Sequence, residues 1–295
     1  MFSSLLAVAA LTAPANPEHA IVTVDWLAAR LGDPQVVILQ VGDDRSKATY
    51  DAGHIPGSLF LHPWRQISAP RTEGSLALEM PTARQLEDSL RALGISDGSW
   101  VVLVPADEYF TPTTRSYLTL LYAGLERVSI LDGGLEAWKA AGKPVTTDVP
   151  TPARGSFTPR LHPELIVDAT FVNDNRSKGT VAVIDARDTR FYEGADTRQG
   201  RNGHIPGATS VPFTSIVTEN GFFKDRESLR RILVDAGAQP GDKVVTYCHI
   251  GQQATLVWFA AHLLGYDAAL YDGSFQDWAK RVELPVDPGK GGQQP

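Results

Sequence analysis

The sequence predicts an α/β protein made of two copies of one domain, each with a central, mainly parallel sheet flanked by helices. Three observations support this fold class. The chain has 295 residues, enough for two domains of ordinary size. Two motifs occur twice in the same order. Between them, apolar runs typical of buried strands alternate with segments of helical spacing, which is the pattern of right-handed crossovers onto a parallel sheet.

The repeated motifs mark the two copies. The turn motif HIPGS at residues 54–58 recurs as HIPGA at 204–208. The motif LDGGLEAW at 131–138 recurs as YDGSFQDW at 271–278. Several matches in a fixed order are hard to obtain by chance, so we interpret them as an internal repeat.

The first copy is predicted to contain three strands and three helices. Its apolar run at 36–41 lacks alternation, as in a parallel strand that is buried on both faces. Thr82 is a suitable N-cap for a helix over 82–93, which ends at Gly94. The other elements are, in order, a strand at 100–104, a helix at 114–123, a strand at 128–131 and a helix carrying Trp138.

The second copy repeats this order. Its predicted elements are a strand at 181–185, a helix at 226–236, a strand at 243–247, a helix at 254–264, a strand at 269–271 and a helix carrying Trp278. Aligning the strands places Pro105 opposite Cys248. The same alignment places Gln40-Val41-Gly42 opposite Asp185-Ala186-Arg187. We expect Trp138 and Trp278 to pack in the core or between the domains.

Domain boundaries follow from the repeat. We predict an N-terminal domain over 20–142 and a C-terminal domain over 160–285. The segment 143–159 is rich in Pro and Thr and is predicted to be a linker. Residues 286–295 are predicted to form a flexible tail.

Residues 1–19 are predicted to be a leader segment. The apolar run at 5–11 is far shorter than the roughly 20 residues that span a bilayer, but its length fits a secretory signal. Ala13-Pro14-Ala15 resembles a cleavage site. We expect an exported, periplasmic protein with no membrane span. The alternative is a cytoplasmic protein whose first residues are not a signal.

Composition excludes several classes of function. The formal net charge of −7 does not favour binding to nucleic acid. Cys248 is the single cysteine, which excludes an internal disulfide, a CxxC redox pair and any metal centre with several cysteine ligands. We expect neither a metal nor an organic cofactor.

Cys248 is the candidate nucleophile. It follows the predicted strand 243–247 directly and precedes a helix that begins at residue 254. Ligands of open α/β sheets bind beyond the carboxyl ends of the strands. A helix N-terminus there stabilises a thiolate and other anions. We expect an anion cradle made by the backbone N–H groups of His249, Ile250, Gly251, Gln252, Gln253 and Ala254.

A cysteine followed by five residues and a helix is also the plan of tyrosine phosphatase loops. Those enzymes place an arginine after the five residues, where this chain has Ala254. Without that arginine, the loop lacks the bidentate donor for a phosphoryl group. The loop is better suited to an extra sulfur atom carried as a persulfide.

Together these motifs resemble the tandem-domain rhodanese family of thiosulfate and 3-mercaptopyruvate sulfurtransferases. The matching motifs are IDAR at 184–187, GHIPGA at 203–208, the Cys248 loop, and YDGS with Trp278. The resemblance covers nearly all of the chain after residue 20. It implies that the first domain is a degenerate copy, in agreement with Pro105 and with the longer segment 106–113 that replaces the active loop. We expect the first domain to pack over the second and shape its entrance.

The resemblance implies that Arg187 binds the anionic part of the sulfur donor, for which a guanidinium is well suited. The loop sequence HIGQQ matches neither the basic loops of thiosulfate-selective members nor the small residues of mercaptopyruvate-selective ones. His249 could stabilise the thiolate or a bound anion when protonated, or lie at the rim without effect. Gln252 and Gln253 are candidate neutral donors to the substrates.

Two further residues recur in both copies and are therefore expected to be structural. His204 corresponds to His54, and Asp272 corresponds to Asp132. Since the first copy lacks the nucleophile, a residue that both copies share is explained most simply by its role in the fold.

The predicted reaction has two steps and ping-pong kinetics. The Cys248 thiolate takes a sulfane sulfur from thiosulfate, and the persulfide passes it to cyanide or a low-molecular-weight thiol. A protein acceptor is also compatible with the sequence. The alternatives are a 3-mercaptopyruvate sulfurtransferase and a non-catalytic carrier that receives its persulfide from a partner.

Overall fold

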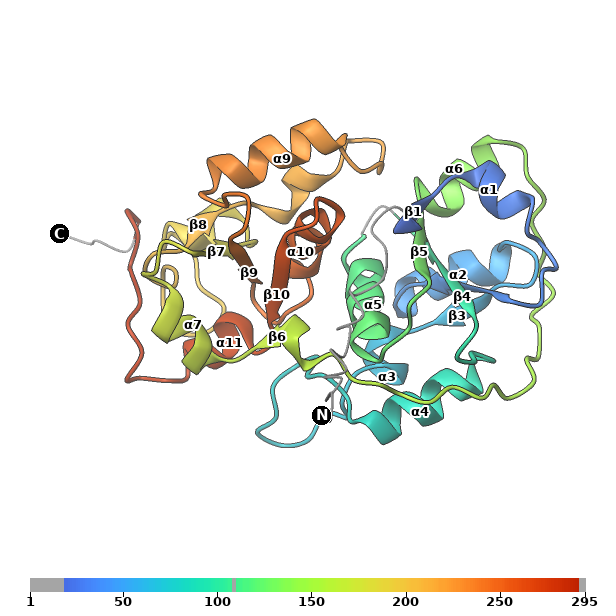
Figure 1. Ribbon diagram of the computed structural model, residues 1–295, viewed down its shortest axis with the longest axis horizontal. Coiled ribbons are helices and arrows are strands. Elements are labelled where there is room, and N and C mark those ends of the chain that lie inside the picture. The colour runs from blue at the N-terminus through green and yellow to red at the C-terminus, as the bar shows by residue number, and fades with distance from the viewer. Residues whose placement is uncertain (1–18, 108–109, 292–295) are drawn as a thin grey trace, which may run out of the picture.

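A computed structural model describes residues 19–107 and 110–291 and contains two sheets of five strands each. The strand orders are β1-β5-β4-β2-β3 and β6-β10-β9-β7-β8, and every neighbouring pair is parallel. Figure 1 shows the two domains side by side, each sheet flanked by helices. The α/β fold class is confirmed. Apart from His19, the predicted leader lies outside the described residues.

The N-terminal domain contains the first eleven elements. They are β1 (Ile21–Val22), α1 (Val24–Ala28), β2 (Val36–Val41), α2 (Asp44–Ala52), β3 (Leu59–Leu61), α3 (Pro63–Gln66), α4 (Ala83–Ala92), β4 (Trp100–Pro105), α5 (Thr111–Tyr122), β5 (Val128–Leu131) and α6 (Gly134–Ala140).

The C-terminal domain contains the remaining elements. They are η2 (Pro163–Leu165), β6 (Ile166–Val167), α7 (Ala169–Asn175), β7 (Val181–Asp185), α8 (Thr189–Tyr192), β8 (Thr209–Ser210), η3 (Phe213–Ile216), α9 (Arg226–Asp235), β9 (Lys243–Tyr247), α10 (Ala254–Leu263), β10 (Asp267–Tyr271) and α11 (Ser274–Trp278). None of the helices in the described ranges has the length and apolar character needed to cross a membrane.

The register of the two sheets confirms the alignment of the copies. Gln40 of β2 pairs with Val104 of β4, and Asp185 of β7 pairs with Tyr247 of β9. The next residues along β4 and β9 are Pro105 and Cys248. Pro105 therefore occupies the position of the cysteine at the carboxyl edge of the first sheet.

The segment 106–113 is only partly a loop. Helix α5 begins at Thr111, three residues before the predicted start, and includes Pro112 in its first turn. Proline is well tolerated in a first turn because the N–H it lacks has no partner within the helix. Five residues, 106–110, separate Pro105 from α5, and five residues, 249–253, separate Cys248 from α10. The prediction of a longer segment in place of the active loop is therefore wrong, because α5 begins earlier than its sequence indicates.

Helices α5 and α10 pack against each other between the two sheets (Figure 1). The Oγ1 atoms of Thr114 and Thr255 lie 2.8 Å apart, and the rings of Tyr117 and Phe259 meet edge to face at 4.8 Å. One continuous apolar cluster contains side chains of both domains. The domain interface is therefore part of the hydrophobic core.

The segments that follow the two copies return to the same place in each domain. Thr146 pairs with His54, and Asp287 pairs with His204, in antiparallel bridges. Gly291 N–H also donates to Glu193 O at 2.7 Å. The prediction of a flexible tail is therefore wrong at Asp287 and Gly291, because their backbone groups are paired with residues of the C-terminal domain. Residues 292–295 lie outside the described residues.

Candidate active site

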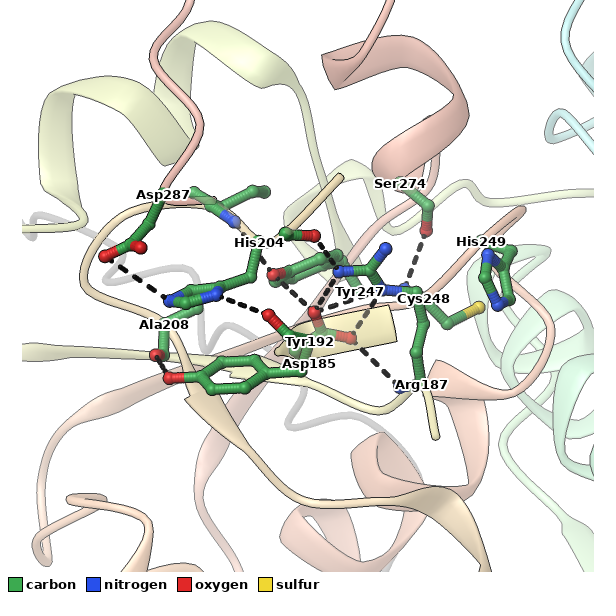
Figure 2. A network of polar contacts seen from close by, with 12 residues as sticks. Asp185, Arg187, Tyr192, His204, Ala208, Tyr247, Cys248, His249, Ser274 and Asp287 are labelled. Atoms are coloured by element: carbon green, nitrogen blue, oxygen red, sulfur yellow. Dashed lines mark hydrogen bonds and ion pairs between the residues drawn. The ribbon is translucent and has the colours of Figure 1, made fainter. Parts of the chain in front are cut away.

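Cys248 lies at the carboxyl end of β9 and is fully buried. Its N–H donates to Ser274 Oγ at 3.2 Å, and its carbonyl accepts from Phe275 N–H at 3.0 Å. In Figure 2 the sulfur lies on the side of His249, away from Asp185. The start of α11 thus fixes the backbone on both sides of the nucleophile.

Two carbonyl groups of the loop after Cys248 accept hydrogen bonds from other elements. The His249 carbonyl accepts from Gln276 N–H at 3.0 Å, and the Gly251 carbonyl accepts from Arg115 Nη1 at 3.1 Å. Within the described ranges, the N–H groups of residues 249–254 donate to no protein acceptor. Consecutive free N–H groups at a helix N-terminus form an anion-binding concavity.

Gly251 makes this loop geometry accessible. Its φ of +78° lies in the left-handed region, where a side chain is strained. A Cβ there would also lie only 2.7 Å from the Asp272 carbonyl oxygen. Only glycine therefore fits this turn without displacing its neighbours.

Ser274 holds the nucleophile and is itself strained. Its φ is +51°, one of two non-glycine residues with positive φ in the described chain. Its hydroxyl donates to Tyr271 O at 2.9 Å and accepts from Cys248 N–H. In the N-terminal domain the equivalent residues are Gly134 and Pro105, so both the hydroxyl and the N–H are absent. The N-terminal domain therefore has neither the donor nor the acceptor of this hydrogen bond.

Arg187 is 2% exposed and forms a buried ion pair with Asp185. Its Nε lies 2.9 Å and its Nη2 2.6 Å from the two carboxylate oxygens, and Nη2 also donates to Gly203 O at 2.7 Å. Burial disfavours its charge, but the Asp185 carboxylate outweighs this effect and raises the pKa of Arg187. The guanidinium stacks on Phe275 at 4.1 Å. Direct binding of a donor by Arg187 stays a prediction.

Tyr247 extends the same network, which Figure 2 shows beside Cys248. Its hydroxyl donates to Asp185 Oδ2 at 2.7 Å and accepts from Ile205 N–H at 3.1 Å. Burial, reinforced by the Asp185 carboxylate, raises the pKa of Tyr247 well above its ordinary value. The network therefore ties the Cys248 strand to the repeated turn motif.

A pocket of about 510 Å³ lies between the domains in front of the Cys248 loop. The loop contributes His249, Ile250, Gln252 and Gln253. The other lining residues are Gly42, Asp43, Asp44, Arg45, His62, Pro63, Trp64, Arg65, Pro112, Arg198 and Gln199. The N-terminal domain thus forms one wall of the entrance, as the sequence predicts.

The charged side chains that line the pocket are mostly paired. Arg45 lies 2.9 Å from Asp43, and Arg65 lies 2.6 Å from Asp44. Arg198 has no carboxylate partner among the described residues and lies over the Phe191 ring at 5.2 Å. Arg198 is therefore the guanidinium best able to meet an incoming anion.

His249 is buried rather than exposed at the rim. Its ring meets Phe191 edge to face at 4.5 Å, and its Nδ1 lies 3.2 Å from Gln199 Oε1. Burial, followed by the nearby Arg187 and Arg198 charges, lowers the pKa of His249 to about 4. Burial and the two guanidiniums thus disfavour the protonated form of His249 that would support the thiolate, and the part of His249 in the reaction stays a prediction.

The two glutamines differ in their surroundings. Gln252 Oε1 accepts from Trp64 Nε1 at 2.9 Å, and its Nε2 donates to Thr111 Oγ1 at 3.1 Å. Gln252 therefore joins the loop to the N-terminal domain, and its amide is already engaged. Gln253 lines the pocket, and its Oε1 is buried without a described partner. Contact of either side chain with a substrate stays a prediction.

The repeated histidines have the structural role predicted for them. Nδ1 of His204 donates to Tyr192 O, and Nδ1 of His54 donates to Tyr50 O, both at 2.8 Å. Each imidazole also stacks on the ring of that tyrosine. These matching contacts fix the turn motif in both domains.

The repeated aspartates also have a structural role, at the domain interface. Asp272 accepts from Met80 N–H at 2.9 Å, and Asp132 accepts from Phe223 N–H at 3.4 Å. Each aspartate thus receives a backbone donor from the other domain.

Sequence reasoning missed Ser274 and Arg198. Ser274 could have been found by comparing YDGS with LDGG, where the serine replaces a glycine. Arg198 lies in a segment that the first copy lacks, since the tyrosine–histidine spacing is 12 residues in the second copy and 4 in the first. An insertion beside the active loop is a signal of function.

Comparison with known proteins supports the same assignment. The profile of the Rhodanese-like domain family matches residues 23–141 and 168–281. The chain is 30% identical to a thiosulfate sulfurtransferase of Azotobacter vinelandii, over 88% of this chain and 92% of that protein. It is 32% identical to a 3-mercaptopyruvate sulfurtransferase of Escherichia coli, over 91% and 98%.

Other similar proteins include a carrier. The chain is 31% identical to the sulfur carrier protein TtuD of Thermus thermophilus, over 94% of this chain and 99% of that one. Among solved structures, SseA of Escherichia coli superposes with a TM-score of 0.76 at 30% identity, covering 87% of this chain and 98% of SseA.

Proposed function

This chain belongs to the rhodanese family as a tandem-domain sulfurtransferase, and on that premise we propose that it moves a sulfane sulfur from thiosulfate to a thiol or cyanide through a persulfide on Cys248. The free N–H groups of residues 249–254 around the end of β9 support this proposal most directly. They would stabilise a persulfide anion together with the positive end of α10.

The proposed reaction needs no external oxidant or reductant. The Cys248 thiolate attacks the outer sulfur of thiosulfate, the S–S bond of the donor breaks, and sulfite leaves with the electron pair. An acceptor thiolate then attacks the outer sulfur of the persulfide. A new S–S bond forms on the acceptor, and the Cys248 thiolate is regenerated.

Proton requirements favour thiosulfate as the donor. Sulfite leaves as a stable anion, whereas the enolate of pyruvate that leaves mercaptopyruvate must take up a proton. His249, with its pKa lowered to about 4 by burial and by Arg187 and Arg198, is neutral at pH 7 and is a weak acid. The loop after Cys248, in which His249 is the one titratable side chain, therefore supplies no strong acid to protonate the enolate that mercaptopyruvate releases.

3-Mercaptopyruvate is the second candidate, because of the charge of the pocket. The pocket is lined by three guanidiniums and two carboxylates, so the formal net charge of these groups is +1. This net charge matches a monoanion better than the dianion thiosulfate. The Escherichia coli relative is named for this donor.

Steady-state turnover with each donor, at matched concentrations and with cyanide as acceptor, tests the proposal. We expect a higher kcat/KM for thiosulfate and no turnover by Cys248→Ser. A higher kcat/KM for mercaptopyruvate would overturn the thiosulfate assignment. A persulfide that forms but turns over with no small acceptor would instead indicate a carrier, as in the name of the Thermus relative.

Arg198 is predicted to bind the donor. Arg198→Gln should raise the KM for thiosulfate about tenfold, as expected for one lost charge-assisted contact, while kcat changes little. The control is Arg154→Gln, which removes an exposed arginine paired with Asp88 outside the pocket. Equal KM values for Arg198→Gln and the control would contradict this role.

We also propose that the protein is exported after cleavage of its leader. The apolar run and the residues Ala13-Pro14-Ala15 support this proposal. Sequencing the N-terminus of the protein isolated from its native cells should find Asn16 first. An intact Met1 would contradict export by this route.

A further inference from the structure

A buried arginine of the N-terminal domain reaches the active loop of the other domain. Arg115 of α5 is 1% exposed. Its Nη1 donates to Gly251 O at 3.1 Å and to Asp272 Oδ1 at 2.6 Å, and its Nη2 donates to Leu78 O. Gly251 and Asp272 belong to the C-terminal domain, whereas Leu78 belongs to the N-terminal domain. Arg115 therefore joins three segments at the domain interface.

The Gly251 carbonyl receives its hydrogen bond from the N-terminal domain, whereas four other carbonyls near it receive theirs from the catalytic domain. The carbonyls of Cys248 and His249 accept N–H groups of α11, in the same domain. The carbonyls of Gln252 and Gln253 accept N–H groups from the first turn of α10. Among the described groups, Arg115 Nη1 is the partner of the Gly251 carbonyl.

The orientation of this carbonyl determines the direction of a cradle N–H. The Gly251 carbonyl and the Gln252 N–H belong to one peptide group and point in opposite directions. When Arg115 holds the carbonyl outward, the N–H of Gln252 is directed to the opposite side, toward the anion concavity. Gly251 is also the loop residue with the greatest backbone freedom, so this peptide can rotate if it is not held.

We propose that Arg115 is a positioning residue for sulfur transfer, by which the domain without a nucleophile keeps the Gly251–Gln252 peptide in its anion-binding orientation. This inference rests on the proposed function of Cys248. Among the described residues, the Arg115 guanidinium donates to Gly251, Asp272 and Leu78, none of which lines the pocket, so we infer that it acts through the loop. Its loss should slow formation of the persulfide without weakening binding of the donor.

A purely structural role for Arg115 must be separated from positioning. Asp272 is mostly buried, and removing Arg115 alone would leave its carboxylate without its cation, which is strongly destabilising. The test therefore uses Arg115→Met, Asp272→Asn and the double variant. In the double variant the uncompensated charge is gone, and the amide oxygen that replaces the Asp272 carboxylate can still accept from Met80 N–H.

Release of sulfite from thiosulfate in a single turnover, measured by rapid mixing, gives the rate of the chemical step that forms the persulfide. We expect the double variant to regain most of the thermal stability lost by Arg115→Met. Its rate should stay about 10- to 100-fold below wild type, the range expected for a displaced catalytic group, with the donor concentration for half-maximal rate unchanged. Asp272→Asn alone should keep most of the rate. A double variant with the wild-type rate would overturn the proposal.

The matched control is Arg91→Met. Arg91 also donates to a backbone carbonyl, that of Phe157 at 2.9 Å, and neither residue lines the pocket or belongs to the Cys248 loop. We expect this variant to release sulfite at the wild-type rate. A loss as large as that of the double variant would show that any lost arginine has this effect, and would also overturn the proposal.

A second measurement distinguishes failure of this inference from failure of the proposed function. If the wild-type protein forms no persulfide, the proposed function fails. Cys248 is the single cysteine, so alkylation by iodoacetamide still reports on its loop alone. The positioning role predicts that the double variant is alkylated several-fold more slowly at neutral pH than wild type and Arg91→Met, because the Gln252 N–H no longer helps to stabilise the thiolate that reacts. Equal rates would overturn it.

Discussion

At the scale of single residues, the hydrogen bond between Cys248 and Ser274 is the clearest difference between the two domains. A non-glycine residue in the left-handed region costs on the order of 1–3 kcal/mol, yet Ser274 adopts a φ of +51°. The cost is offset because the serine hydroxyl satisfies the buried N–H of Cys248. Where the nucleophile is replaced by Pro105, the serine is replaced by Gly134, and neither partner is needed.

Substitution of Ser274 tests this balance. Ser274→Ala should lower the free energy of unfolding by about 1–3 kcal/mol, because it leaves a buried N–H without an acceptor and keeps the strained backbone. Ser274→Gly should cost less, since glycine adopts positive φ readily. Urea unfolding measures both. An alanine variant as stable as wild type would contradict this account of Ser274.

His249 gives a prediction about pH. Its pKa is lowered to about 4, so it stays neutral as the pH falls from 8 to 6. Between those values the rate of sulfur transfer should show no step that depends on His249, and His249→Asn should leave the shape of the pH profile unchanged. A step between pH 6 and 7 that disappears in His249→Asn would show that the histidine titrates near its ordinary value.

At the scale of elements, α10 explains how the domains are joined. All ten of its residues are buried, because it packs on its own sheet and on α5 of the other domain. His262 lies in this helix, stacked on Trp258 at 5.1 Å, with its Nε2 3.3 Å from the Tyr117 hydroxyl. Burial lowers the pKa of His262 to about 4.

The buried His262 should make stability depend on pH. Between pH 6.5 and 4 the unfolded chain binds a proton at this histidine and the folded chain does not, so acid favours unfolding. His262 should therefore contribute a loss of up to about 3 kcal/mol as the pH falls from 7 to 4. Urea unfolding at pH 7 and pH 5 should show a smaller difference for His262→Gln than for wild type. Equal differences would contradict this prediction.

Elements with a strong apolar signal were predictable, and those without one were not. The strands at 36–41, 128–131, 181–185 and 243–247 have the predicted bounds because most of their residues are apolar or β-branched. Strands β1, β3, β6 and β8 have only two or three residues each, too few for any period. Helix α2 buries little more than Ser46 and Tyr50, so it lacks an apolar face.

The C-terminal segment and the active site also contain features that the sequence does not predict. Residues 286–291 have the composition of a disordered end, but Asp287 pairs with His204 and Gly291 donates to Glu193, which composition does not reveal. The position of Cys248 could be predicted because it depends on local order along the chain. The contacts of Arg115 and Gln252 could not, because they join residues more than 100 positions apart.

At the scale of the whole molecule, the N-terminal domain is part of the active site although it has no nucleophile. Trp64 and Thr111 hold the Gln252 amide, Arg115 holds the Gly251 carbonyl, and other residues form the pocket wall. The loop 67–82 reaches across to the other domain, as Figure 1 shows, and Ala77 exchanges two hydrogen bonds with the Gln276 amide. The second copy therefore depends on the first for the shape of its loop.

The central claim is that Cys248 carries a sulfur atom between donor and acceptor, and intact-protein mass spectrometry tests it most directly. After incubation with thiosulfate, the wild-type protein should gain the mass of one sulfur atom and lose it again when a thiol or cyanide is added. Cys248→Ala should gain nothing. A wild-type protein that gains no sulfur from thiosulfate or from mercaptopyruvate, or an equal gain by Cys248→Ala, would contradict the account.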